Sequence, residues 1–113
     1  MNLKAEASSD RSKPETATDR LRRLRKSPDF AAVWTAHSEE RMVEYGFDKL
    51  SIHRIVKSGA IRAGEPDLHG REQVHVSGTV DAEAVDIVVE PALSSDGSDV
   101  VRIVTVKPKK RRR

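Results

Sequence analysis

Hydrophobic positions follow two different spacings along the chain, and the spacing changes at Gly59. From about residue 27 to this glycine, apolar residues recur every three or four positions, which is typical of one face of an α-helix. Beyond it, apolar and polar residues alternate, as in a β-strand with one buried face. Residues 1–19 follow neither spacing and are almost devoid of apolar side chains. The chain therefore predicts helices first and strands second.

Two helices are predicted before Gly59. Ser27 is a favourable N-cap and Pro28 a favourable first residue for a helix that runs to about Tyr45, where the following glycine stops it. Asp48 is a favourable N-cap for the second helix, which ends at Gly59. Both helices are amphipathic, so each is expected to bury one side against another element.

Three or four strands are predicted after Gly59, and short turns join them. Pro91 interrupts the alternation, and Ser94–Gly97 has the composition of a turn. The expected strands cover residues 60–63 (a short edge strand), 72–80, 84–90 and 99–107. This order predicts an α+β fold in which the two helices pack on one face of a three- to four-stranded antiparallel sheet.

The net charge of +3 combines three segments of different charge. Residues 1–26 hold eight Lys or Arg against four Asp or Glu, residues 27–106 hold seven against fourteen, and residues 107–113 hold six basic residues and no acidic one. We therefore expect a disordered basic arm over 1–26, a folded acidic domain over 27–106 and a basic C-terminal tail over 107–113. Within the arm, residues 19–26 form either a short basic helix or a solvated linker.

The basic C-terminal tail has two interpretations. Its cations can neutralise several phosphates, which predicts salt-sensitive, sequence-independent binding of nucleic acid. These cations are Lys107, Lys109, Lys110, Arg111, Arg112 and Arg113. The alternative is a solubilising terminus that discourages pairing beside the last strand. The contrast between basic ends and an acidic domain also permits contact with an acidic protein partner.

The composition excludes several classes of site. Cysteine is absent, which excludes disulfides, a thiolate nucleophile and a cysteine zinc site. No apolar run approaches the ~20 residues that span a bilayer, so we expect a cytoplasmic protein without membrane contact. His53 is expected at the surface and His69 in a flexible loop, and the histidines show no metal-ligand spacing, so neither metal nor cofactor is expected. His75 lies on a polar strand face, where it either contacts nucleic acid or is solvated.

Two ionisable residues fall on the apolar side of the first predicted helix. At about 100° per residue, His37 and Arg41 lie on either side of Phe30, in the middle of the apolar stripe that also contains Trp34. Unpaired polar groups at such positions cost several kcal/mol, on the order of 2–7. The pair therefore either finds hydrogen-bond and ion-pair partners in the core or serves a catalytic site.

The motifs resemble those of a family of small bacterial domains of unknown function. Its members have a helical His-x-x-x-Arg, a glycine turn into a second helix, and a final strand that carries a threonine. The corresponding stretches here run from His37 to Asp48 and from Val101 to Val106, with Thr105 in the final strand. The family is generally grouped with the RelE-, MqsR- and barnase-like fold. The better-known members of this fold are metal-independent ribonucleases, which are often toxins that an antitoxin partner holds.

The resemblance implies His37, Arg41 and Thr105 as catalytic residues. His37 would act as acid or base, Arg41 would hold the phosphate, and Thr105 would donate a hydrogen bond. Thr105 shares the alternation of Val101 and Ile103, so it is expected on the helix-covered side of the sheet. The function expected from this resemblance is RNA cleavage. The alternative is a non-catalytic module that binds nucleic acid or a protein partner with its basic tails.

Overall fold

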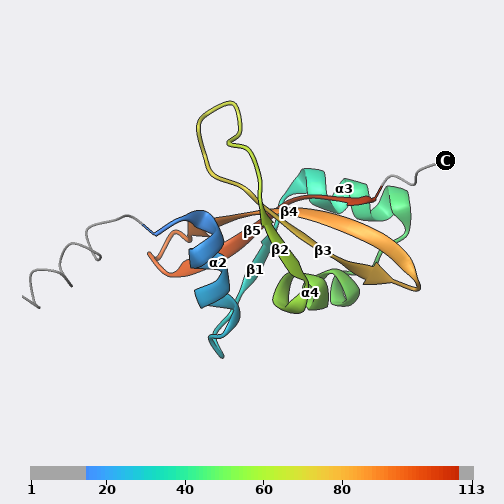
Figure 1. Ribbon diagram of the computed structural model, residues 1–113, viewed down its shortest axis with the longest axis horizontal. Coiled ribbons are helices and arrows are strands. Elements are labelled where there is room, and N and C mark those ends of the chain that lie inside the picture. The colour runs from blue at the N-terminus through green and yellow to red at the C-terminus, as the bar shows by residue number, and fades with distance from the viewer. Residues whose placement is uncertain (1–14, 110–113) are drawn as a thin grey trace, which may run out of the picture.

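A computed structural model describes residues 15–109 of the chain. Over this range it has an α+β fold with three helices and a five-stranded mixed sheet (Figure 1). The elements are α2 (Ala17–Arg25), β1 (Ala32–Trp34), α3 (Ala36–Tyr45), α4 (Lys49–Ser58), β2 (Ala60–Ala63), β3 (Val74–Val80), β4 (Glu83–Leu93) and β5 (Asp99–Pro108). None of the described helices is long and apolar enough to cross a membrane.

The strand order across the sheet is β1-β5-β4-β3-β2. β2 to β5 pair antiparallel, as the alternating pattern predicts, whereas β1 pairs parallel with β5. The prediction of an α+β fold is therefore confirmed. The prediction of a purely antiparallel sheet of three or four strands is wrong, because a fifth strand joins the sheet in parallel.

The extra strand comes from the segment predicted as the start of the first helix. Residues Ala32–Trp34 pair with β5, and the helix begins only after Thr35. Thr35 is a strong N-cap: its hydroxyl accepts the Ser38 backbone N–H at 3.1 Å, and the Ser38 hydroxyl accepts the Thr35 N–H at 3.0 Å. This reciprocal pair of bonds places the helix start at Ala36 and corrects the predicted start at Ser27.

The second predicted helix is confirmed as α4. Asp48 is its N-cap and accepts the Ser51 backbone N–H, and Gly59 is its C-cap. The hydrogen bond from the Ser51 hydroxyl to the Asp48 carboxylate lowers the pKa of Asp48. Ile52, Ile55 and Val56 form its buried side.

One face of the sheet, which we call the apolar face, carries the core. Its fully buried strand residues are Val74, Val76, Val85, Ile87, Val89, Val101, Ile103 and Val106. The isoleucines of α4 and the leucines of α2 belong to the same buried cluster. α3 packs against β5 and lies beside the C-terminal end of that strand (Figure 1).

Helix α2 corrects the prediction of a disordered arm over residues 1–26. Leu21 is fully buried and Leu24 is 8% exposed, so the helix is an integral part of the core. The alternative of a short basic helix over 19–26 is confirmed in kind, although α2 begins earlier, at Ala17. Residues 1–14 of the predicted arm lie outside the described residues.

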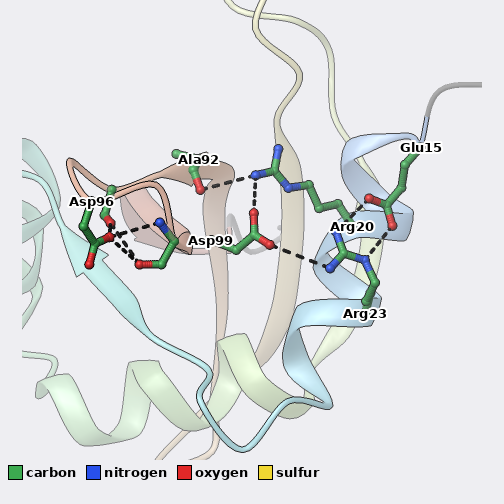
Figure 2. Close-up of polar contacts among 8 residues, drawn as sticks. Glu15, Arg20, Arg23, Ala92, Asp96 and Asp99 are labelled. Atoms are coloured by element: carbon green, nitrogen blue, oxygen red, sulfur yellow. Dashed lines mark hydrogen bonds and ion pairs between the residues drawn. The ribbon is translucent and has the colours of Figure 1, made fainter.

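Polar contacts attach α2 to the end of β4 and the start of β5 (Figure 2). Arg20 donates to Asp99 at 2.7 Å and to the carbonyl of Ala92 at 3.4 Å. Arg23 donates to Glu15 at 2.9 Å, lies 3.8 Å from Asp99, and its hydrogen bond lowers the pKa of Glu15. The basic side chains of α2 are thus partly neutralised by carboxylates of the described domain.

Two irregularities in the sheet differ from the predicted alternation. Pro91 lies inside β4 instead of ending it, because β3 pairs with β4 only as far as Val89 and leaves β4 without a neighbour on that side. The second irregularity is a β-bulge between β4 and β5. Val88 pairs with Thr105 and Val89 pairs with Ile103, so β5 contains one extra residue here.

Candidate functional site on the polar face of the sheet

The opposite face of the sheet, which we call the polar face, gathers most of the ionisable strand residues. Strand register places Arg62 of β2, His75 of β3, Val88 of β4 and Thr105 of β5 in one row across four strands. The next row holds Ser77, Asp86 and Lys107. Glu90 and Arg102 form a third pair on this face. Apart from the central strand β4, these side chains are half-buried or exposed, so the polar face is accessible to a ligand.

His75 and Asp86 form a hydrogen-bonded pair in the middle of this face. The distance from His75 Nδ1 to Asp86 Oδ2 is 2.8 Å. The Asp86 side chain is 7% exposed and the His75 side chain is 22% exposed. A carboxylate in this position favours the imidazole tautomer that has its proton on Nδ1, which leaves Nε2 as the acceptor. The pair thus presents a nitrogen base at an accessible surface.

The second oxygen of Asp86 is buried and has no hydrogen-bond partner among the described residues. The nearest cation is Arg62, whose Nη2 atom lies 4.0 Å from this oxygen. The Arg62 side chain is 63% exposed, so its guanidinium also faces solvent beside His75. A histidine, a buried carboxylate and an exposed guanidinium therefore meet at adjacent strand positions.

Gly64 provides the space that the His75 ring occupies. A Cβ atom at this glycine would lie 2.6 Å from His75 Cδ2 and 3.0 Å from Nε2. The backbone N–H of Gly64 donates to the carbonyl of Gln73, which fixes the end of β2 against the start of β3. The close approach of this backbone holds the imidazole ring in a defined orientation.

Glu90 is a second buried carboxylate on the polar face, four residues further along β4. Its Oε1 lies 3.6 Å from Arg102 Nη1 and 4.0 Å from Arg71 Nη1, and its Oε2 is buried without a hydrogen-bond partner in the described part of the chain. Arg71 belongs to the β2–β3 loop, which Asp67 organises by accepting two backbone N–H groups. These bonds, led by that from Arg71, lower the pKa of Asp67.

His37 and Arg41 are not where the helical wheel places them. The helix begins at Ala36, so the stripe that Phe30 and Trp34 define does not belong to it. The buried residues of α3 are instead Ser38 and Met42, and His37 is exposed. The predicted core-facing position of His37 is therefore wrong.

Arg41 is half-buried on the same helix. Its Nη1 atom lies 2.6 Å from Glu44 Oε1, and its Nε atom is buried without a hydrogen-bond partner among the described residues. Arg41 thus forms an ion pair at the surface through Nη1, whereas its Nε–H donor has no acceptor among the described residues. Its predicted role as a phosphate ligand stays a prediction.

Thr105 also differs from its predicted position, because the β-bulge changes the phase of the alternation. Val101 and Ile103 lie on the apolar face, but after the extra residue it is Val106 that returns to this face. Thr105 is opposite Val88 and therefore on the polar face. Residues 15–109 contain no hydrogen bond or ion pair that joins Thr105 to His37 or Arg41. The structure instead places Thr105 in the row of His75.

The remaining predicted site residues have simple surroundings. Lys107 and Lys109 are exposed at the end of β5, whereas Lys110, Arg111, Arg112 and Arg113 lie outside the described residues. His53 is half-buried, and its ring centroid lies 5.4 Å from that of Phe30. His69 is exposed in the β2–β3 loop. No three His, Cys, Asp or Glu side chains within 15–109 converge as metal ligands do.

The sequence predictions missed the two carboxylates of β4 as site residues. The signal was present: in the valine-rich segment 84–90, the apolar positions alternate with Asp86 and Glu90, which puts both carboxylates on the face opposite the core. His75 occupies the same polar phase of the preceding strand. Only the register of β3 against β4 shows that His75 and Asp86 are in contact.

Comparison with known proteins adds no relative: no family model, no curated protein and no solved structure matches this chain.

Proposed function

We propose that the protein acts on RNA and cleaves it without a metal ion. The observation that carries this proposal is the arrangement of the polar face, where a histidine base lies beside Arg62 and in one row with Thr105. Cleavage by the neighbouring 2′-hydroxyl requires a base and a cation that stabilises the charge on the phosphate. The polar face offers both groups from residues on adjacent strands.

The charge pattern supports a polyanionic substrate in spite of the acidic domain. Arg62, Arg102 and Lys107 lie on the polar face, and the carboxylates among them, Asp86 and Glu90, are both buried. The cations are thus more accessible than the anions on this surface. Lys107 also begins the basic C-terminal segment of the sequence, so that segment starts at the edge of the same face. Such a distribution favours contact with phosphates.

The alternative function is a module that binds nucleic acid or an acidic protein through its basic ends and performs no chemistry. One observation favours it: the acidic side chains of the polar face already have cationic neighbours, as in a structural charge network. A toxin that an antitoxin protein holds is a further form of the first proposal. It rests on the family resemblance of His37, Arg41 and Thr105 described above.

The test uses the full-length protein and total RNA in the presence of EDTA. The proposal predicts RNA fragments that accumulate with time and carry 2′,3′-cyclic phosphate and 5′-hydroxyl ends. A variant that lacks residues 110–113, which keeps all of β5, is expected to cleave more slowly, and the difference is expected to shrink at high salt. Intact RNA, together with RNA binding that the same truncation abolishes, would contradict the proposal and support the binding module.

A further inference from the structure

We infer that His75 is the general base of RNA cleavage, that Asp86 positions it, and that Arg62 is the phosphate ligand. The inference rests on the proposed function, because it names the residues of that reaction. It transfers to His75 the proton transfer that the family resemblance assigns to His37. Three independent features of the polar face carry it: the geometry of the pair, the burial of the carboxylate and the row of side chains around the ring.

The geometry of the pair defines which nitrogen reacts. Asp86 binds Nδ1 of His75 at 2.8 Å, so Nε2 faces away from the carboxylate, and this atom has no hydrogen-bond partner within residues 15–109. A base needs such an unoccupied nitrogen, and it also needs a fixed ring orientation. Gly64 supplies the second condition, because its backbone lies close against the edge of the ring.

The burial of Asp86 determines that this carboxylate acts on His75 and not on the substrate. A carboxylate that is 5% exposed is costly unless hydrogen-bond donors surround it, yet one of its oxygens has none among the described residues. Its other oxygen contacts Nδ1 of His75 at 2.8 Å, so it remains in contact with the ring after Nε2 has accepted a proton. Asp86 therefore acts through His75 and does not touch the substrate.

The neighbouring side chains match the other requirements of the reaction. Arg62 is the β2 partner of His75 in the register of the sheet, and its guanidinium is largely exposed. A guanidinium binds two oxygens of one phosphate, which suits it to hold the phosphodiester beside the base. Thr105 lies across two strand spacings from His75, about 10 Å away. A dinucleotide unit can bridge this separation, so Thr105 is within reach of a sugar or phosphate next to the reacting one.

The chemical step balances without any further reactant except water. His75 Nε2 takes the proton of the RNA 2′-hydroxyl, and the 2′-oxygen forms a bond to the adjacent phosphorus. The bond from this phosphorus to the 5′-oxygen of the next nucleotide breaks, and that oxygen takes a proton from water. The products are a 2′,3′-cyclic phosphate and a 5′-hydroxyl, and His75 returns its proton to the solvent.

The experiment compares single variants in the EDTA cleavage assay, after circular dichroism has shown that each is folded. His75→Ala is expected to lower kcat by about 100-fold or more, and added imidazole is expected to restore part of the rate. Arg62→Gln is expected to lower kcat/KM by about 10-fold or more. Because the Arg62 side chain is largely exposed, this substitution is expected to leave the fold intact. The control is His69→Ala, because this histidine is exposed in the β2–β3 loop, away from the proposed site. The His69→Ala variant is expected to cleave RNA at the wild-type rate.

Asp86→Asn tests the positioning role. It is expected to lower kcat with little change in KM, while the imidazole ¹⁵N shifts of His75 report a change of tautomer. If Asp86 is merely structural, kcat stays at the wild-type value in the folded variant even though the shifts change. If RNA is cleaved and the His75→Ala variant keeps the wild-type rate while His37→Ala loses it, the inference is overturned and the proposed function stands. If the wild type cleaves no RNA, both are overturned.

Discussion

The most specific structural prediction concerns Leu21 of α2, the helix that the sequence places in a disordered arm. Its side chain is fully buried among residues of α4 and the apolar face. Replacing a fully buried leucine with alanine removes its packing and leaves a cavity, which costs about 2–5 kcal/mol. Leu21→Ala is therefore expected to remove a large part of the stability of a domain this small, which is about 5–15 kcal/mol in total.

The control for this prediction is Leu50→Ala. Leu50 also lies in a helix, α4, but its exposure is 60%, so the same substitution is expected to change the free energy of unfolding by no more than about 0.5 kcal/mol. Both substitutions exchange the same two residue types within a helix, so helix propensity contributes equally to each. The difference between the variants therefore isolates the burial of Leu21.

The assays are urea unfolding and thermal unfolding, both followed by far-ultraviolet circular dichroism. The expected result is a lower midpoint for Leu21→Ala with an unchanged m-value, and a drop in Tm of about 4–8 °C for each kcal/mol lost. If Leu21→Ala and Leu50→Ala unfold within about 0.5 kcal/mol of one another, α2 does not contribute to the cooperative core and the packing described here is wrong.

Three further predictions concern the loops and close contacts. Gly78→Ala places a Cβ atom 2.8 Å from Ile55 Cγ1, and we expect the displaced α4 to cost about 1–3 kcal/mol in urea unfolding; a stability equal to wild type would contradict this packing. Gly64→Ala is expected to push the His75 ring away from its carboxylate, change its ¹⁵N shifts and slow RNA cleavage, whereas unchanged shifts would show that the ring has other room. Serine hydroxyls lower the pKa of Asp96 to about 2 from 3.8, so the stability it contributes is present above pH 4 and lost as the pH falls towards 2 (Figure 2). The difference in unfolding free energy between wild type and Asp96→Asn should therefore shrink over this range, and a difference independent of pH would refute the assignment.

The parts of the fold that local sequence determines could be predicted. α4 has a capping aspartate and a terminal glycine within its own segment, and both signals proved correct at Asp48 and Gly59. Strands β3 and β5 show their alternation in the sequence because their buried residues lie mainly on one face, and the Val/Ile-rich β4 is buried on both faces from Val85 to Glu90. Their boundaries differed from the predicted ones only where pairing with a neighbour decides the end, as at Pro91.

The elements that depend on distant partners could not be predicted. Ala32–Trp34 is a strand because it pairs with Val101–Ile103, almost 70 residues away, and three residues carry too little pattern to show this. α2 is ordered because Leu21 is buried in the core and Arg20 forms a hydrogen-bonded ion pair with Asp99. These contacts form only in the folded domain.

The candidate site illustrates the same limit. The predicted core-facing position of His37 was wrong because the helix starts at Ala36 and not at Ser27. The predicted face of Thr105 was wrong because β5 contains one extra residue, which places Thr105 on the polar face. The contact between His75 and Asp86 depends on strand register, which the spacing of residues within one strand does not contain.

The most direct test of the central claim, that RNA binds the polar face at His75, is a chemical-shift map. ¹⁵N-labelled protein is titrated with a short RNA in which deoxyribose prevents cleavage. RNA binding at this face is expected to give the largest shifts at Arg62, His75, Thr105 and Lys107, which lie on β2, β3 and β5. Shifts confined to the exposed start of α3 around His37, with the polar face unchanged, would contradict it.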